Sequence, residues 1–164
     1  MRRSTLARAH GRRLECGALL CAAAAAASLA LSGCSVVHIN GSWRTKNHSL
    51  CVIRPAVVEP AVHGTLLKLL AKKGFRVTEL KHGTPPEACQ QTILYTWARE
   101  QYYLPTWVTQ YAINMDLFVA GEKVANASFD PTRNLSPHVK YVRFSRYLAR
   151  TLDKLFPGRP LIGA

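Results

Sequence analysis

Alternation of apolar and polar residues between positions 91 and 129 is the feature that most constrains the fold of this chain. Successive residues of a β-strand point to opposite faces of a sheet, so such alternation predicts strands with one buried face. The segments 91–103 and 106–119 both follow this pattern, and Pro105 separates them. A turn over 120–123 then leads into a returning strand over 124–129. The buried face is expected to carry Ile93, Tyr95, Trp97, Tyr111, Ile113, Met115, Leu117 and Val119.

Two helices and two short strands complete the expected domain. Apolar residues recur at helical spacing over 60–73 and again over about 138–156. Short apolar runs at 50–53 and 75–80 predict strands. The predicted order is β-α-β-β-β-β-α, which favours a two-layer α+β domain. Its sheet would be mainly antiparallel, with two helices packed on one face.

The N-terminus resembles that of exported bacterial lipoproteins. An arginine-rich start leads into an apolar run that is too short to span a bilayer, and the run ends in Leu31-Ser32-Gly33-Cys34. This tetrapeptide resembles a lipobox, which implies cleavage before Cys34, lipidation of its sulfur and usually acylation of the new amine. The alternative is an uncleaved N-terminal anchor. Because Ser35 replaces the Asp that retains many lipoproteins in the inner membrane, the resemblance implies an outer-membrane protein with a periplasmic domain.

This interpretation divides the chain into four parts. We expect a signal peptide at 1–33, a lipidated N-terminus and tether at 34–49, a periplasmic domain at 50–157 and a C-terminal tail at 158–164. Trp43, within the tether, would contact lipid headgroups or pack on the domain.

The charge belongs mostly to the folded part, because 17 basic and eight acidic residues lie at or after Cys34. An exported basic protein meets anionic lipid, lipopolysaccharide phosphates or cell-wall polymers, so nucleic acid is not an expected partner. Four cations recur on the last predicted helix, opposite its apolar stripe, and would form an anion-binding face or simply a solvated one. They are Arg143, Arg146, Arg150 and Lys154.

The cysteines predict one cross-link. Cys51 and Cys89 remain after signal cleavage and lipidation, and disulfides persist in oxidising compartments. The bridge would close a loop of about 39 residues, for which chain entropy predicts about 4 kcal/mol. The alternative is two separate buried thiols. With no Cys-x-x-Cys pair and no cysteine–histidine cluster at ligand spacing, we expect neither a metal nor a cofactor besides the lipid on Cys34.

Aromatic residues gather around the turn at Leu104-Pro105 and form a candidate binding surface. Aromatics anchor interfaces, so a groove for a glycan, an acyl chain or a protein is one hypothesis, and packing within the sheet is the other. The residues are Trp97, Tyr102, Tyr103 and Trp107, with Tyr111 beside them.

No residue pattern predicts catalysis. The chain has no Gly-x-Ser-x-Gly, His-Glu-x-x-His, phosphate-loop or dinucleotide motif. Glu100 and Asp116, on neighbouring predicted strands, are the one carboxylate pair that a glycosidase could use, but exposed strand charges are commoner. The histidines are scattered and are expected at the surface.

The mature chain also resembles a group of small uncharacterised proteobacterial lipoproteins. The resemblance rests on the lipobox, on Lys73-Gly74-Phe75, on Pro86 with Cys89, and on Leu94-Tyr95-Thr96 with Ala98. It implies no activity. We therefore expect a non-catalytic, membrane-anchored lipoprotein that binds another envelope component. The alternatives are an accessory subunit of envelope transport or lipid handling, and an enzyme that acts on cell-wall or lipid substrates.

Overall fold

A computed structural model gives the structure of the chain and describes residues 37–104, 106–131 and 143–159, without the side chains of 102–104 and 106. The chain divides into two compact units, 1–34 and 35–164, and all of the described residues belong to the second. The predicted signal peptide and Cys34 therefore lie outside the described residues.

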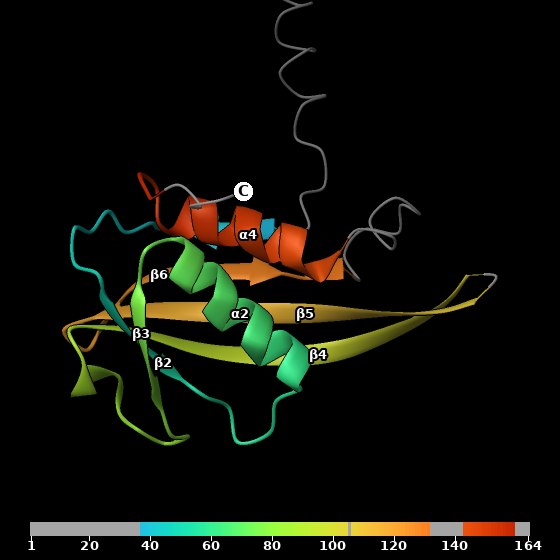
Figure 1. Ribbon diagram of the computed structural model, residues 1–164, viewed down its shortest axis with the longest axis horizontal. Coiled ribbons are helices and arrows are strands. Elements are labelled where there is room, and N and C mark those ends of the chain that lie inside the picture. The colour runs from blue at the N-terminus through green and yellow to red at the C-terminus, as the bar shows by residue number, and fades with distance from the viewer. Residues whose placement is uncertain (1–36, 105, 132–142, 160–164) are drawn as a thin grey trace, which may run out of the picture. The chain divides into compact units, whose positions relative to one another are not determined.

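A mixed six-stranded sheet organises the domain, in the order β1-β6-β5-β4-β2-β3 (Figure 1). The strands are β1 (Val37–Asn40), β2 (Ser49–Ile53), β3 (Arg76–Leu80), β4 (Gln91–Leu104), β5 (Thr106–Val119) and β6 (Glu122–Phe129). Strands β1, β6, β5 and β4 pair antiparallel, whereas β2 runs parallel to both β3 and β4. The predicted α+β class and element order are confirmed, with β1 as an additional strand.

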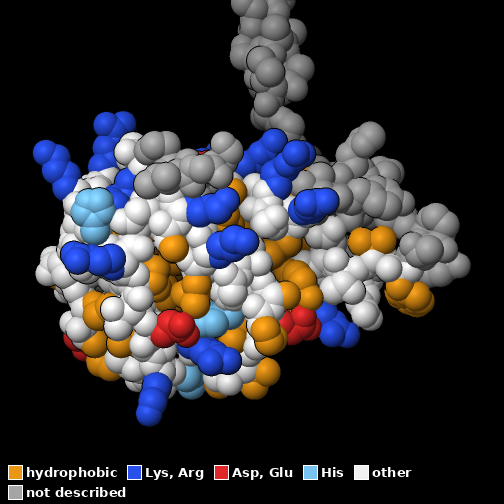
Figure 2. Space-filling model, in the orientation of Figure 1, with side chains coloured by type: hydrophobic (Ala, Val, Ile, Leu, Met, Phe, Trp, Pro, Cys, Tyr) orange, Lys and Arg blue, Asp and Glu red, His pale blue; other side chains and the backbone are white. Residues whose placement is uncertain are grey.

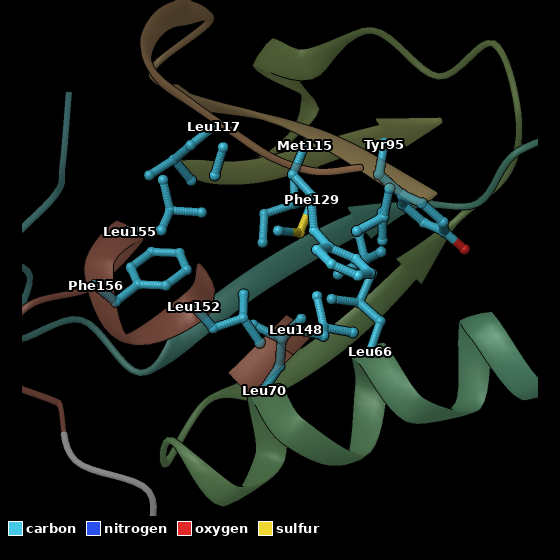
Figure 3. Close-up of a cluster of buried hydrophobic side chains, with 14 of the residues drawn as sticks. Leu66, Leu70, Tyr95, Met115, Leu117, Phe129, Leu148, Leu152, Leu155 and Phe156 are labelled. Atoms are coloured by element: carbon cyan, nitrogen blue, oxygen red, sulfur yellow. The ribbon is translucent and has the colours of Figure 1, made fainter. Parts of the chain in front are cut away.

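Helices α2 (Pro60–Lys72) and α4 (Phe144–Leu155) contact each other and cover one face of this sheet (Figure 1). The sheet side chains that point toward them are those of the predicted alternation, because period two places every second residue on one face. The core between the layers includes Leu66, Leu70, Tyr95, Met115, Leu117, Phe129, Leu148, Leu152, Leu155 and Phe156, as Figure 3 shows.

The helix-free face of the sheet is partly covered by the connection from β3 to β4. This connection contains the short 3-10 helix η1 (Pro86–Ala88), and the hydroxyl of Thr92 donates to the carbonyl of Pro86 at 2.8 Å. Cys51 and Cys89 form a disulfide with their Cα atoms 6.2 Å apart, which fastens the connection to β2. Within β2, Leu50 and Val52 join the core between the layers, while Cys51 and Ile53 are buried on the other side.

The segment predicted as a tether differs from expectation, because β1 lies within it and pairs with β6. Trp43 follows β1 and packs against the core. Its backbone N–H donates to the carbonyl of Leu155 at 2.8 Å, and its indole N–H donates to the side chain of Gln91 at 3.1 Å. Most of the predicted tether therefore belongs to the domain, because residues 37–40 pair with β6 and Trp43 bonds to Leu155 and Gln91.

The last helix begins at Phe144 in the structure, whereas the sequence predicted a start near His138, which lies outside the described residues. In the part of the chain that the structure describes, no helix is both long enough and apolar enough to cross a bilayer.

Candidate functional site

The outer face of α4 carries the four predicted cations. The helix buries Tyr147, Leu148, Thr151, Leu152 and Leu155, so residues on the opposite side of its turn face solvent. Its one acidic residue, Asp153, pairs with Lys73. No carboxylate within the described residues forms an ion pair with any of the four cations, which lie at the solvent-facing side of the helix: Arg143, Arg146, Arg150 and Lys154.

Figure 2 shows Lys and Arg side chains spread over the helical layer of the domain. The segment after β1 adds to this charge, because the bond between Trp43 and Leu155 brings Arg44 and Lys46 toward the C-terminal end of α4. We call the four cations of α4 the basic face. Such a face can attract phosphate or carboxylate groups without holding them in a fixed geometry, because its long side chains are solvated.

The predicted aromatic surface is not one groove. Trp97 pairs in register with Ile113, whereas Trp107 pairs with Tyr103, six residues farther along β4. At about 3.4 Å per residue the backbone positions of the two tryptophans are about 20 Å apart along the hairpin. The side chains of Tyr102 and Tyr103 lie outside the described residues.

Trp97 belongs to the edge of the core, while Trp107 is 69% exposed. The indole N–H of Trp97 donates to the carbonyl of Val57 at 2.8 Å, and its ring tilts against that of Tyr111 at a centroid distance of 6.3 Å. Packing within the sheet, the second interpretation, therefore describes Trp97. Trp107 lies near the end of the hairpin, which extends past both helices (Figure 1).

Glu59 fastens the loop after β2 to this hairpin. Its carboxylate accepts from the hydroxyl of Tyr111 at 2.5 Å and from the guanidinium of Arg99 at 3.1 Å. The Tyr111 bond, followed by that from Arg99, lowers the pKa of Glu59, and the same carboxylate raises the pKa of Tyr111. These contacts hold the loop in place.

The carboxylate pair Glu100 and Asp116 is separated in the structure. Glu100 lies opposite Gln110, six residues along β5 from Asp116, so about 20 Å separates the two backbone positions. Asp116 instead pairs with the ammonium of Lys123 at 2.7 Å and accepts from Asn126 at 2.6 Å. Two catalytic carboxylates must lie within about 10 Å of each other, so this pair cannot serve a glycosidase.

A buried histidine is the feature that sequence reasoning missed. His63 on α2 is 8% exposed, and its Nδ1 and Nε2 atoms lie 2.7 Å from the hydroxyl of Tyr95 and 2.7 Å from a carboxylate oxygen of Glu79. The sequence pattern that could have predicted its burial is the spacing of His63 from Leu66 and Leu70. These intervals of three and seven residues place it on the apolar stripe of the helix. Glu79 of β3, His63 of α2 and Tyr95 of β4 thus form a row of three hydrogen-bonded side chains.

A cleft of about 340 Å³ lies beside this row, at the carboxyl ends of the parallel strands β2 and β3. Glu79 forms part of its wall, together with the charged or titratable Arg54, Lys81 and His82. The ends of parallel strands are common ligand sites. The cleft is open and its cations are exposed, so it can attract an anionic group but does not enclose one.

A second depression, of about 270 Å³, lies on the helix-free face of β4, β5 and β6. Small or polar side chains form most of its lining, including Thr96, Ala98, Ala112, Asn114 and Ser128. Among the described residues, no group of three or more His, Cys, Asp or Glu side chains could hold a metal ion.

No protein-family profile matches this chain, and no curated protein sequence matches it. The likeness found lies among solved structures. The chain resembles a PelC dodecamer subunit from Paraburkholderia phytofirmans, with a TM-score of 0.51 and 9% identity over 73% of this chain and 98% of that one. A leucine-to-methionine variant of the same PelC aligns with a TM-score of 0.44 and 10% identity over 73% of this chain and 93% of that one. At such identity the likeness shows a shared fold alone.

Proposed function

We propose that this chain is a non-catalytic lipoprotein of the bacterial envelope, anchored in the outer membrane through Cys34, whose domain binds another envelope component. The observation that carries the proposal is the lipobox-like Leu31-Ser32-Gly33-Cys34, placed directly before a folded domain that begins with β1 at Val37. A cysteine after a small-residue pair provides the thiol that accepts the lipid. Several acyl chains then give a stable anchor, at roughly 0.8 kcal/mol per buried CH₂.

The disulfide supports export. Cys51 and Cys89 are joined across a sequence separation of 38, and such bonds persist in the periplasm but are rare in the cytosol. The PelC likeness supports a fold that a multi-subunit assembly can use, and it supplies no residue roles.

The surface that we assign to partner binding is the end of the β4–β5 hairpin with the exposed Trp107. Large exposed aromatics are enriched at the centre of protein interfaces. A filled core and an open depression favour this interpretation over an enclosed lipid-carrying groove, because a groove for acyl chains needs a deep apolar cavity.

Radioactive palmitate labelling in cells tests the anchor. Wild-type chain should incorporate label, and Cys34→Ala should lose it. Cys21→Ala is the matched control, since it removes a cysteine of the apolar run but leaves the lipobox intact. Persistent labelling of Cys34→Ala, or none in the wild type, would refute the proposal.

Membrane fractionation tests the location. Wild type should sediment with the outer membrane, and Ser35→Asp should shift it toward the inner membrane in a host that sorts by this position. A Ser35→Ala variant should behave as wild type. A wild-type chain found in the inner membrane would refute the assignment to the outer one.

In-cell crosslinking identifies the component that is bound. A photoreactive amino acid at position 107 should capture a defined species, whereas one at the exposed Glu122, the first residue of β6 and at the opposite end of β5, should not. PelC was solved as a dodecamer, so a second copy of this chain is one candidate, visible as a covalent dimer. Equal capture from both positions, or none, would refute the assignment of this surface.

A further inference from the structure

The proposed anchor, Cys34, is close along the chain to β1, and β1 packs beside α4. Only Ser35 and Val36 separate Cys34 from the first residue of β1, Val37. Three Cα–Cα steps span at most about 11 Å, so a lipidated Cys34 keeps the start of β1 within that distance of the headgroups. The domain therefore rests on the membrane and cannot stand away from it.

The start of β1 lies next to the first turns of α4. Val37 pairs in register with Phe129 of β6. The ring of Phe129 stacks on that of Tyr147 at a centroid distance of 4.5 Å and lies 6.3 Å from that of Phe144. The two aromatic partners belong to the first turn of α4, so the residue that follows the anchor segment lies beside this helix.

The side of α4 that faces away from the core carries the four cations and one carboxylate, that of Asp153, which pairs with Lys73. From Arg143 to Lys154 the basic face extends over about 16 Å, at 1.5 Å of rise per residue. Anionic phospholipid headgroups complement such a row of cations, and juxtamembrane basic groups bind anionic leaflets additively.

We propose that the basic face of α4 docks on anionic phospholipid headgroups of the membrane that holds Cys34. Docking fixes the orientation of the domain, with the helical layer toward the lipid and the helix-free face with its depression turned away from it. The orientation rests on the proposed lipid anchor, but headgroup binding by the basic face does not.

Accessibility of single cysteines tests the orientation. Native cysteines do not interfere in the mature lipoprotein, because Cys34 is acylated and Cys51 is bonded to Cys89. Lys154→Cys places a thiol within the basic face and leaves its three arginines intact, and Asn114→Cys places one on the helix-free face; both native residues are exposed. The purified full lipoprotein is reconstituted in vesicles of phosphatidylcholine, with or without equimolar phosphatidylglycerol, and labelled with a membrane-impermeant maleimide.

Phosphatidylglycerol should slow labelling of Lys154→Cys several-fold and leave that of Asn114→Cys unchanged. The slowing should vanish when Arg143, Arg146 and Arg150 are replaced by Gln. Equal rates in the two kinds of vesicle, or equal slowing at both thiols, would overturn the proposed orientation.

Flotation of the Cys34→Ala full chain with the same vesicles tests headgroup binding in a protein that carries no lipid on Cys34. Palmitate labelling tests the anchor separately, so a failure of the anchor can be told from a failure of docking. Replacing Arg143, Arg146 and Arg150 by Gln in this background should weaken salt-sensitive binding on the order of a hundredfold, because each cation contributes roughly fivefold. A matched variant with Arg76, Arg99 and Lys123 replaced by Gln loses the same charge outside both the basic face and the cleft, and should bind as the parent does. If both triple variants weaken binding alike, the attraction reports net charge and the basic face has no special role.

Discussion

The Nδ1 atom of His63 and the hydroxyl oxygen of Tyr95 lie 2.7 Å apart inside the domain, where Tyr95 is 2% exposed. A carboxylate oxygen only accepts hydrogen bonds, so the Nε2 atom of His63 carries the proton that it donates to Glu79. In the neutral form of the ring, Nδ1 is then the acceptor for the hydroxyl of Tyr95. Figure 3 shows the Tyr95 hydroxyl pointing out of the apolar cluster, which places its one polar atom at the edge of the core.

This environment predicts a loss of stability at alkaline pH. Burial, assisted by the charge of Glu79, raises the pKa of Tyr95 from 10.0 to about 12. A raised pKa means that the folded state holds the phenolic proton more tightly than the unfolded state does. The stabilisation is complete below pH 10 and is lost as the pH rises through about 12.

Urea denaturation of wild type and Tyr95→Phe across this interval measures the effect. The free-energy difference between them should shrink as the pH rises, because only wild type has this phenol to ionise. A difference between wild type and Tyr95→Phe that does not change with pH would contradict the prediction.

Replacing a glycine by alanine should have opposite effects on the stability of the domain at two positions, Gly41 and Gly64. Gly41 has a φ of +76°, and an added Cβ would lie 2.6 Å from the carbonyl oxygen of Val124 on β6. Gly41→Ala should therefore destabilise the domain by more than about 1 kcal/mol, through the left-handed backbone and the contact with β6. Gly64, inside α2, has open space around it, and Gly64→Ala should stabilise by about 0.5 to 1 kcal/mol. Thermal unfolding of both variants measures these changes in stability. A Gly41→Ala variant as stable as wild type would contradict the prediction and show that β1 shifts or detaches without loss of stability.

Reduction of the disulfide should destabilise the domain by about 4 kcal/mol, because it releases a loop of about 39 residues in the unfolded chain. The double variant Cys51→Ala/Cys89→Ala should lose a similar amount in urea denaturation. Wild type treated with reductant should match it, and the double variant should not respond to reductant. An unchanged wild-type midpoint under full reduction would contradict the prediction.

The sequence predicted β4, β5 and β6 because a single buried face imposes period two on a strand, and it predicted α2 and α4 because an apolar stripe imposes helical spacing. It did not predict β1. That strand has only four residues and depends on pairing with β6 and on contact with α4, which are long-range interactions that leave no local pattern.

Side-chain groupings were predicted less well, for a geometric reason. Trp97 and Trp107 are close in sequence around a turn, but their register positions lie far apart along two long strands. The basic face of α4 could be predicted, since one helix fixes the relative positions of all its members. The row of His63, Tyr95 and Glu79 could not, because three separate elements supply it and only His63 lies on a recognisable stripe.

Lys73, at the C-terminal end of α2, tests how α2 and α4 are held together. Its side chain is fully buried, and its ammonium donates to Asp153 of α4 at 2.6 Å and to the carbonyl of Arg159. Asp153 is about half exposed, so water can solvate its carboxylate when the lysine is removed, whereas the ammonium has no such alternative. Removing Asp153 should therefore destabilise the domain more than removing the charge of Lys73 does.

We expect Asp153→Ala to destabilise the domain by about 2 kcal/mol, since it leaves a buried cation with one acceptor fewer. Lys73→Met keeps most of the buried volume and removes the charge, so it should cost less. In the Lys73→Met background, Asp153→Ala should cost almost nothing, because the group that needed the carboxylate is gone. A double-mutant cycle in urea measures this coupling, and fully additive losses would show that Asp153 stabilises α4 by some route other than Lys73.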